Sequence, residues 1–486
     1  MTTGSSTPLS SLDPSNLAQK VRDMQARAEV CNALMGGTTG MREQGVRYLP
    51  IEPAESPTAW ASRISRTVLF PAFEKAVNMM IGKPFGQSIA IEDDVPVAIK
   101  EALENVDLAG RDFDTFSRDV FKQTLQDGIG WVLADYPRVP TDLTVADERE
   151  LQVQPYLVHI PLANVLGWKS KTISGVPTLT QFRYLEIVET DDGQWGTKDV
   201  KRVRVLEPGQ VTVFQQGADA KWDIVADESG PMTLPQIPLV TFYTGRTAWM
   251  QAQPPMESLA WLNVEHWQSR SDQRHILHFA RVPLLFGKGL ERGTDGQIVI
   301  GPDRLITGAP ESDLKVVEHS GAAIEAGRID LQDIEDAMRR VAGELLTGKV
   351  QKTATETDRE AGEGEATLKQ WVRTFEDALE LCLSLMAQWI KEPSGGTICI
   401  NTEWDDEELQ ADMMTALTNL HDKGLMSKDS VLWNLKQGGK LPPDRTVEEE
   451  KTLIDAEGPS MGALATAALL NPPKVSAAGA TDGVEV

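Results

Sequence analysis

One stretch limits the possible folds more than any other: Met256 to Arg281 contains neither proline nor glycine. As a single helix it would be about 39 Å long, at about 1.5 Å per residue. Its middle, Gln268 to His275, holds no apolar residue, so two turns of it offer nothing to a hydrophobic core. Either this part of the helix bridges two bodies through solvent, or it packs against copies of itself from other subunits.

Two more long amphipathic helices are predicted farther along the chain. Residues 322–346 repeat apolar side chains at a helical period, among them Ile334 and Met338, and residues 366–390 do the same. The run between them is polar and contains glycines, with no large aliphatic residue after Val350. Because such a run cannot bury apolar surface, we predict a flexible loop over residues 347–365.

The part of the chain before these helices combines helices with strands. Residues 15–155 are mainly helical in pattern: Ser56-Pro57 is typical of a helix start, and Pro71 is expected to kink the helix that follows. Between Tyr156 and Tyr243 the period changes to two, with Asp/Gly turns at short intervals. This pattern predicts a small antiparallel β-domain inserted into a helical protein, hence an α+β fold.

Composition excludes several functions. The formal charge is −25, which argues against a protein that holds nucleic acid by neutralising phosphates and against binding to an anionic membrane. The three cysteines lie far apart, and the densest apolar run, Met461 to Leu470, is about half the length needed to cross a bilayer. We expect no membrane partner.

Signals for catalysis or for a bound metal are poor. Gly343 and Gly348-Lys349 match most of a phosphate-binding loop, but Val350 occupies the position of the magnesium-binding hydroxyl, and the segment continues a helix. His275 and His278 have no further ligand at a suitable spacing. The acidic run Asp405–Glu408 begins a predicted helix, where carboxylates interact favourably with the helix dipole. We therefore expect neither an enzyme nor a cofactor.

The order of elements and four short stretches resemble tailed-bacteriophage portal proteins, in particular a less-studied portal-like branch. The stretches are Ser258-Leu259-Ala260-Trp261-Leu262-Asn263 with Ser269-Arg270-Ser271-Asp272; Thr347-Gly348-Lys349 through Thr355-Glu356-Thr357; Gly424-Leu425-Met426-Ser427-Lys428-Asp429-Ser430; and Tyr156-Leu157-Val158-His159-Ile160 ahead of Val165-Leu166-Gly167-Trp168. The resemblance covers roughly residues 15 to 455 and includes no catalytic signature.

The resemblance implies a portal-type α+β fold with long stem and wing helices. The implied segments are a disordered lead (1–14), a helical wing part (15–155), a β-rich wing domain (156–253), a first stem helix (254–281), a clip (282–321), a second stem helix (322–346), a tunnel loop (347–365), a long wing helix (366–392), a C-terminal wing and crown region (393–457) and a flexible tail (458–486).

The resemblance also implies a function at the capsid vertex. The chain would form a homododecameric ring, assembled in the host cytoplasm and placed at the unique vertex of the virion, as the channel for packaging and ejection of double-stranded DNA. Its other partners would be terminase, the major capsid protein or scaffold, and a head–tail adaptor. The tunnel loop would contribute Thr347, Gly348, Lys349, Gln351, Lys352, Thr353 and Arg359 to the channel, and the stem or subunit interface would contain Arg270, Asp272, Arg274, Ile334 and Met338.

Two other classes remain open from the sequence. One is another ring-forming protein, such as a head–tail adaptor or a scaffold protein, although adaptors are usually much shorter chains. The other is a phage nuclease or ATPase, against which the incomplete phosphate loop and the lack of converging carboxylates count.

Overall fold

The computed structural model describes residues 13–138, 153–217, 219–280, 284–290, 308–317, 321–346, 354–402, 417–421, 423–437 and 446–457. The chain forms two compact units, Met1–Thr402 and Glu403–Val486. Helices and antiparallel sheets both contribute, so the predicted α+β class is confirmed.

The first unit contains most of the helices. They are α1 (Gln19–Met35), α2 (Gly37–Glu43), α3 (Pro57–Arg66), α4 (Ala72–Gly82), α5 (Val97–Leu103), α6 (Phe113–Asp127), α8 (Glu257–Ala280), α9 (Ala322–Leu346) and α10 (Ala354–Ile390), with short 3-10 turns η2 (Gly45–Arg47), η3 (Leu162–Asn164) and η4 (Ala226–Glu228). Local signals explain several ends: Ser56 and Asp112 cap α3 and α6 through side-chain oxygens that accept from the backbone, and Gly128 ends α6 in the left-handed conformation.

The helix expected to kink at Pro71 is instead two helices. α3 ends at Arg66 and α4 begins at Ala72, with Thr67 already in an extended conformation. A proline disfavours the helical conformation in the residue before it, so the chain straightens through Phe70 and then starts a new helix.

In the part of the chain that the structure describes, the strands form two larger sheets and three two-stranded ones. A three-stranded antiparallel sheet has the order β10 (Leu239–Tyr243), β2 (Ile129–Asp135), β3 (Tyr156–Ile160), and a six-stranded sheet runs β4 (Val165–Ile173), β5 (Val176–Asp192), β6 (Gly196–Glu207), β7 (Gln210–Gln216), β8 (Trp222–Ile224), with β9 (Gly230–Pro231) beside β7. The small pairs are β1 (Ala90–Ile91) with β15 (Ile398–Cys399), β11 (Arg246–Ala248) with β12 (Gln251–Ala252), and β13 (Leu284–Leu290) with β14 (Gly308–Val317).

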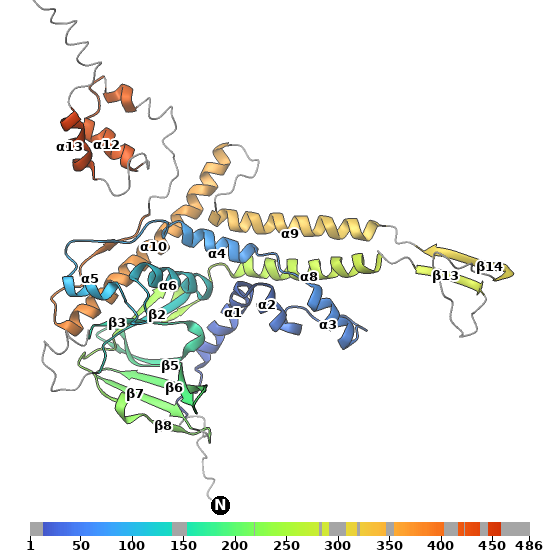
Figure 1. Cartoon of the computed structure of the whole chain (residues 1–486), viewed down its shortest axis with the longest axis horizontal. Coiled ribbons are helices and arrows are strands. Elements are labelled where there is room, and N and C mark those ends of the chain that lie inside the picture. Colours follow the sequence, from blue (N-terminus) through green and yellow to red (C-terminus); the bar gives the residue numbers. More distant parts are fainter. Residues whose placement is uncertain are drawn as a thin grey trace, which may run out of the picture. The chain divides into compact units, whose positions relative to one another are not determined.

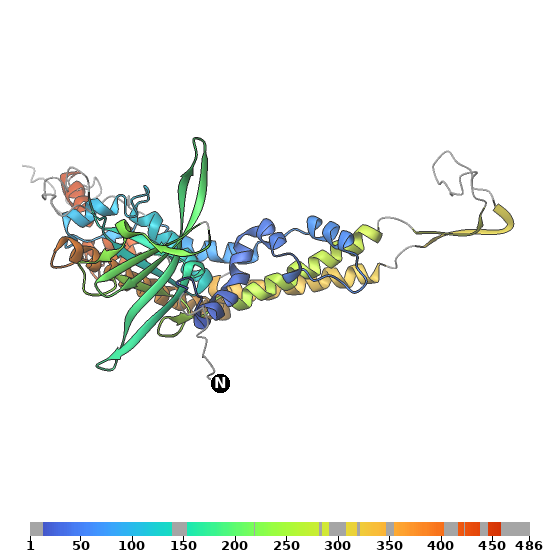
Figure 2. The same ribbon diagram turned by 90° about the horizontal axis from the view of Figure 1, so that it is seen from below.

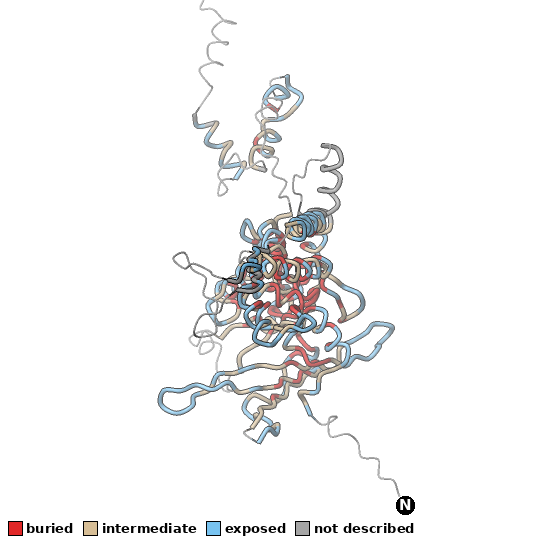
Figure 3. The backbone as a smooth tube through the Cα atoms, turned by 90° about the vertical axis from the view of Figure 1, so that its right-hand side faces the viewer, coloured by how far each residue is buried: buried red, intermediate tan, exposed pale blue. Residues whose placement is uncertain are grey.

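The centre of the first unit is strand β2, which is covered on both faces. Its alternate residues Ile129, Trp131 and Leu133 join α1 and Phe182 of β5 in one hydrophobic core. The other face packs against α6 and α10, where the Trp389 Nε1–H donates to the carbonyl of Ala134 over 2.8 Å. Figure 3 shows the buried part of the chain gathered around this region.

The six-stranded sheet has a long hairpin at each end of β5. Ser174 and Gly175 both have positive φ and connect β4 to β5, and the turn around Gly193 connects β5 to β6. Figure 2 shows these two hairpins running to opposite sides of the sheet. The predicted inserted β region is therefore present, but its sheets also recruit β2, which precedes residue 156.

The long helices occupy the part of the chain that follows. α8 and α9 pack side by side, and the β13–β14 hairpin lies between them in sequence (Figure 1). Both helices match the predicted spans closely, and the hairpin falls within the segment predicted as the clip. α10 then returns to pack on α9 and on the three-stranded sheet.

The predicted tunnel loop is wrong over residues 354–365, because α10 begins at Ala354 rather than near residue 366. Arg359 consequently lies on a helix. Gly362 and Gly364 each disfavour helix by about 1 kcal/mol relative to alanine, but the alanine, glutamate and arginine residues around them are strong helix formers. The rest of the predicted loop, residues 347–353, lies outside the described residues, as do 1–12 of the predicted lead and the whole predicted tail.

The second unit contains α12 (Lys428–Gln437) and α13 (Val447–Glu457). The Ser427 hydroxyl accepts from the amide of Ser430 over 3.1 Å and starts α12, as the sequence predicts. Lys451 and Asp429 form an ion pair of 2.8 Å between the two helices. Of the helix predicted over Asp405–His421, only residues 417–421 are described, and these are helical.

Candidate functional site

The strongest functional candidate is the antiparallel pair of helices α8 and α9. Three polar contacts define its direction: His266 Nε2 lies 3.3 Å from Glu335 Oε1, the Ser269 hydroxyl donates to Asp330 over 2.6 Å, and the Gln273 amide donates to the carbonyl of Ile324 over 2.8 Å. Residue numbers increase along α8 while the numbers of their partners decrease along α9, so the two helices are antiparallel.

The first half of α8 is anchored in the core of the first unit. Leu259, Val264 and Trp267 are buried. Between them the fully buried Asn263 accepts from the amide of Phe73 over 3.0 Å and donates to the carbonyl of Phe70 over 2.9 Å. One amide side chain thus satisfies both backbone groups at the break between α3 and α4, as buried polar groups require.

The polar middle of α8 finds partners within its own chain. Arg63 of α3 is only 4% exposed, forms a bidentate ion pair with Glu55 over 2.9 and 2.8 Å, and lies 3.4 Å from Asp272. The Thr67 hydroxyl donates to that of Ser271 over 3.0 Å, and Gln268 donates to the carbonyl of Tyr48. Residues of α3 and of the segments that flank it therefore contact Gln268, Ser271 and Asp272 within this chain.

The residues predicted for the stem or subunit interface divide into two groups. Ile334 and Met338 are 8% and 2% exposed within this chain, and Asp272 is paired with Arg63. Ile334 and Met338 are thus buried within the subunit itself, whereas the side chain of Asp272 remains 54% exposed beside Arg63. Arg270 and Arg274 form no ion pair with the described residues, and burial lowers the pKa of Arg270, so the two arginines are the part of the prediction that remains available for contact.

A groove of about 380 Å³ runs between the two helices, lined on α8 by Gln268, Asp272 and Gln273 and on α9 by Gly327 and Asp330. A Cβ on Gly327 would lie 2.2 Å from Gln273 Oε1. A larger residue there would displace the amide end of Gln273, which reaches across to the carbonyl of Ile324 in α9.

His266 lies at the buried edge of the pair. Its side chain is 1% exposed and stacks at a tilt on Phe70 with ring centroids 5.1 Å apart. Burial lowers the pKa of His266, although the carboxylate of Glu335 opposes this. Within the described ranges no group of three or more His, Cys, Asp or Glu side chains is arranged to hold a metal ion.

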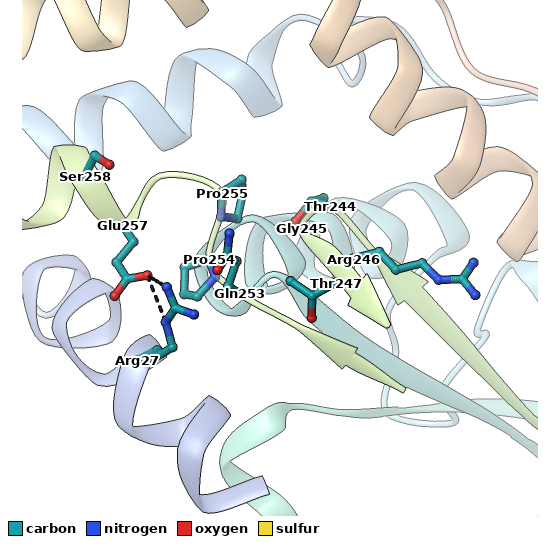
Figure 4. A pocket seen from close by; sticks show the side chains of 10 residues that line it. All are labelled: Arg27, Thr244, Gly245, Arg246, Thr247, Gln253, Pro254, Pro255, Glu257 and Ser258. Carbon is teal, nitrogen blue, oxygen red and sulfur yellow. Dashed lines mark hydrogen bonds and ion pairs between the residues drawn. The ribbon is translucent and has the colours of Figure 1, made fainter. Parts of the chain in front are cut away.

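A second hollow, of about 350 Å³, lies where α8 begins (Figure 4). Arg27 of α1 donates through Nε and Nη2 to Glu257 in the first turn of α8, over 3.0 and 2.7 Å. Behind it the backbones touch: a Cβ on Gly128 would lie 2.2 Å, and one on Gly245 1.8 Å, from the carbonyl oxygen of Gln253. This close packing fixes the direction in which α8 leaves the body of the first unit.

Sequence reasoning missed the residues that support the candidate site. Arg63 and Glu55 lie far from α8 in sequence, and nothing in their spacing indicates that they meet it. Asn263 carried a usable signal, because a lone amide within the apolar stripe of a helix has to find a buried partner. The tunnel residues Thr347, Gly348, Lys349, Gln351, Lys352 and Thr353 lie outside the described residues.

Comparison with known proteins gives one family match and several similar structures. Residues 255–390, which run from the start of α8 to the end of α10, match a domain of unknown function, DUF4055. No curated protein matches the chain. Among the described residues, every helix is too short or too polar to cross a lipid bilayer.

Three of the similar solved structures are parts of gene transfer agent (GTA) particles. One, from the neck of an empty GTA particle computed with C6 symmetry, is 14% identical, with a TM-score of 0.43, over 77% of this chain and 90% of that one. A chain of the native GTA virion is also 14% identical, with a TM-score of 0.39 over the same shares. A third, from the neck of a native particle computed with C12 symmetry, is 12% identical, with a TM-score of 0.39 over 75% and 89% of the two chains.

Proposed function

We propose that the protein is a structural subunit of the head–tail junction of a phage-like particle, and specifically a portal-type subunit that surrounds a DNA channel. The observation that carries the proposal is the antiparallel α8–α9 pair, which leaves the body of the first unit, passes through the β13–β14 hairpin and returns to α10. That is the stem, clip and wing order that the sequence resemblance predicts.

The charge of the chain suits a channel through which DNA moves. A strongly basic wall would hold the phosphates and release many counterions, which makes binding tight. A chain with a formal charge of −25 avoids this. The few cations near the start of α10, Lys349, Lys352 and Arg359, would offer weak contacts that salt screens.

The proposed assembly is a closed ring of identical subunits, a dodecamer by resemblance, at the capsid vertex. A ring requires two different surfaces on each subunit that fit each other. In this role the protein performs no catalysis and carries no cofactor: it is the platform on which terminase docks during packaging, and then the head–tail adaptor, while its rim meets the major capsid protein or scaffold.

Electron microscopy of the purified full chain tests this proposal. We expect negative-stain images to show rings with a central hole, and symmetry averaging to give the subunit number. If dilute protein is monomeric, particles purified from the producing cells provide the second measurement. Absence of the chain from the vertex of those particles would refute the proposal, as would ATP hydrolysis or DNA cleavage by the purified protein.

A head–tail adaptor is the second candidate, because it would also form a ring. The two differ in when they act. A portal subunit is present in empty proheads and binds terminase, whereas an adaptor joins only after the head is filled. Detection of the chain in unfilled proheads by mass spectrometry supports the portal role, and its presence only in filled heads supports the adaptor role.

A further inference from the structure

Strand β5 extends beyond its neighbours at both ends, and each extension is a two-stranded ribbon. At one end residues 169–173 of β4 pair with residues 176–181 of β5, beyond the reach of β6, whose pairing with β5 starts at Phe182. At the other end residues 187–201 of β5 and β6 extend past β4, whose last partner is Tyr184, and past β7, whose last partner is Arg202. We name residues 169–179 the basic arm and residues 187–201 the acidic arm.

The basic arm carries only positive charge. It contains Lys169 and Lys171 and no carboxylate, in a chain whose formal charge is −25. No carboxylate among the described residues forms an ion pair with either lysine. At its tip Ile173 pairs with Val176, and their side chains are 56% and 62% exposed. Because side chains alternate along a strand, Lys171 lies on the same face as Ile173.

The acidic arm carries a complementary face. Glu189 lies directly opposite Asp199, an unfavourable pairing of like charges, and Asp191 follows on the same face. Ile187 occupies this face nearer the sheet and is 59% exposed. Lys201 lies opposite Ile187 on this face, so the face carries three carboxylates and one lysine beside an aliphatic group, whereas the face of the basic arm carries lysines alone.

Both arms leave large apolar side chains exposed within the subunit. A two-stranded ribbon without a covered face is marginal in water, and these ribbons expose the large apolar groups of their tips, including Trp195, which is 92% exposed. The arms lie at opposite ends of a single strand of 17 residues, about 55 Å apart at about 3.3 Å per residue. A subunit cannot bring them together, but two copies of it can.

We propose that the basic arm of one subunit docks against the acidic arm of the next. Ile173 and Val176 would pack on Ile187, while Lys171 and Lys169 would neutralise Glu189, Asp191 and Asp199 of the neighbouring copy. The contact is heterologous, because each subunit uses one arm for each neighbour, so it repeats around a ring. The inference deepens the proposed function by naming the surfaces that join neighbouring subunits of the assembly. It rests on that function only in the expectation that successive contacts close into a ring.

A charge exchange tests the docking. The full chain is compared with K169E/K171E, with E189K/D199K and with the variant carrying all four substitutions, by mass photometry and sedimentation up to the solubility limit. We expect each double variant to raise the concentration needed for assembly by about tenfold or more, since like charges then meet across the contact. The fourfold variant has the charges exchanged and regains assembly. The control K75E/K423E replaces two exposed lysines elsewhere in the chain with the same change in net charge. We expect it to assemble like the wild type.

Cross-linking tests the direction of the contact. In a C399S background, which removes the exposed cysteine, V176C with I187C and a short bismaleimide should give a ladder of covalent multimers. Either cysteine alone should give monomers, because the two positions meet only between different arms. A ladder from a single cysteine, or none from the pair, overturns the proposal.

The outcomes separate this inference from the proposed function. Rings that assemble equally well in all the charge variants refute the docking of the arms and leave the ring intact. Assembly that follows the charge exchange but yields open filaments supports the arms and refutes the ring. A wild-type chain that stays monomeric to its solubility limit and forms no cross-linked ladder refutes the inference.

Discussion

At the scale of single residues, the structure stands out for buried polar groups that serve folding. Asp127, at the end of α6, is 1% exposed and forms no ion pair within the described part of the chain. The amides of Gln123 and Asn32 donate to its two oxygens over 2.8 and 2.9 Å. Burial raises the pKa of Asp127 from 3.8 to about 6, although these hydrogen bonds oppose the shift. The folded state therefore favours the protonated acid.

This shift predicts a dependence of stability on pH. Because the pKa of Asp127 is higher in the folded state, its protonation supports folding below about pH 4, and that support is lost as the pH rises through about 6. The uncharged D127N should therefore gain stability relative to wild type between these values, by about 2 to 3 kcal/mol at neutral pH. Denaturant unfolding of both proteins at pH 4.5 and 7.5 measures the gain.

The exposed acid Asp93 provides the control. D93N should change the free energy of unfolding by a similar small amount at pH 4.5 and at pH 7.5. If the difference between D127N and wild type is the same at pH 4.5 and 7.5, ionisation of Asp127 does not limit stability.

At the scale of elements, the α8–α9 pair is held by a short apolar contact within a polar surface. Ile334 and Met338 are buried on α9, whereas Ile329 on the same helix is 47% exposed. Around the buried pair lie the hydrogen bonds from Ser269 and Gln273 of α8. The helices are therefore joined by a few buried side chains, each of which carries a large share of the contact.

Truncation at these positions should separate buried from exposed apolar residues. M338A should lower the free energy of unfolding by about 2 to 5 kcal/mol, since it leaves a cavity between packed helices. I329A, a change of similar size at an exposed position of the same helix, should change it by less than about 0.5 kcal/mol. Thermal and denaturant unfolding followed by tryptophan fluorescence compares the two. Equal effects would mean that α9 does not pack through Met338.

At the scale of the whole molecule, the proposed channel depends on the short stretch between α9 and α10. K349E/K352E should leave folding and ring assembly unchanged, because the sequence around these lysines supplies no apolar residue to a core apart from Val350. DNA packaging or retention should fall, since the ring would lose its weak contacts with phosphates. Particle yield and packaged DNA, measured by quantitative amplification after nuclease treatment, test this, with K75E/K423E as the control of equal charge. Normal packaging by the double variant would exclude these lysines from the channel wall.

The sequence by itself determined the elements whose signals are local. The spans of α8 and α9, the caps at Ser56, Asp112 and Ser427, and the strands of the β region follow from hydrophobic period and from side chains that satisfy nearby backbone groups. Local signals failed where two of them conflicted: Gly362 and Gly364 suggested a loop, while the helix formers around them extended α10 to Ala354.

Only the tertiary structure decided which distant residues meet. The sequence suggested that the polar middle of α8 could face another subunit, yet Arg63, Thr67 and Tyr48 of the same chain contact three of its side chains. The opposite charges of the two arms of β5 likewise became visible only once the pairing of the strands was known. The physical reason is that a hydrogen bond or an ion pair depends on distance in space, and periodicity along the chain reveals which face a residue occupies but not what packs against that face.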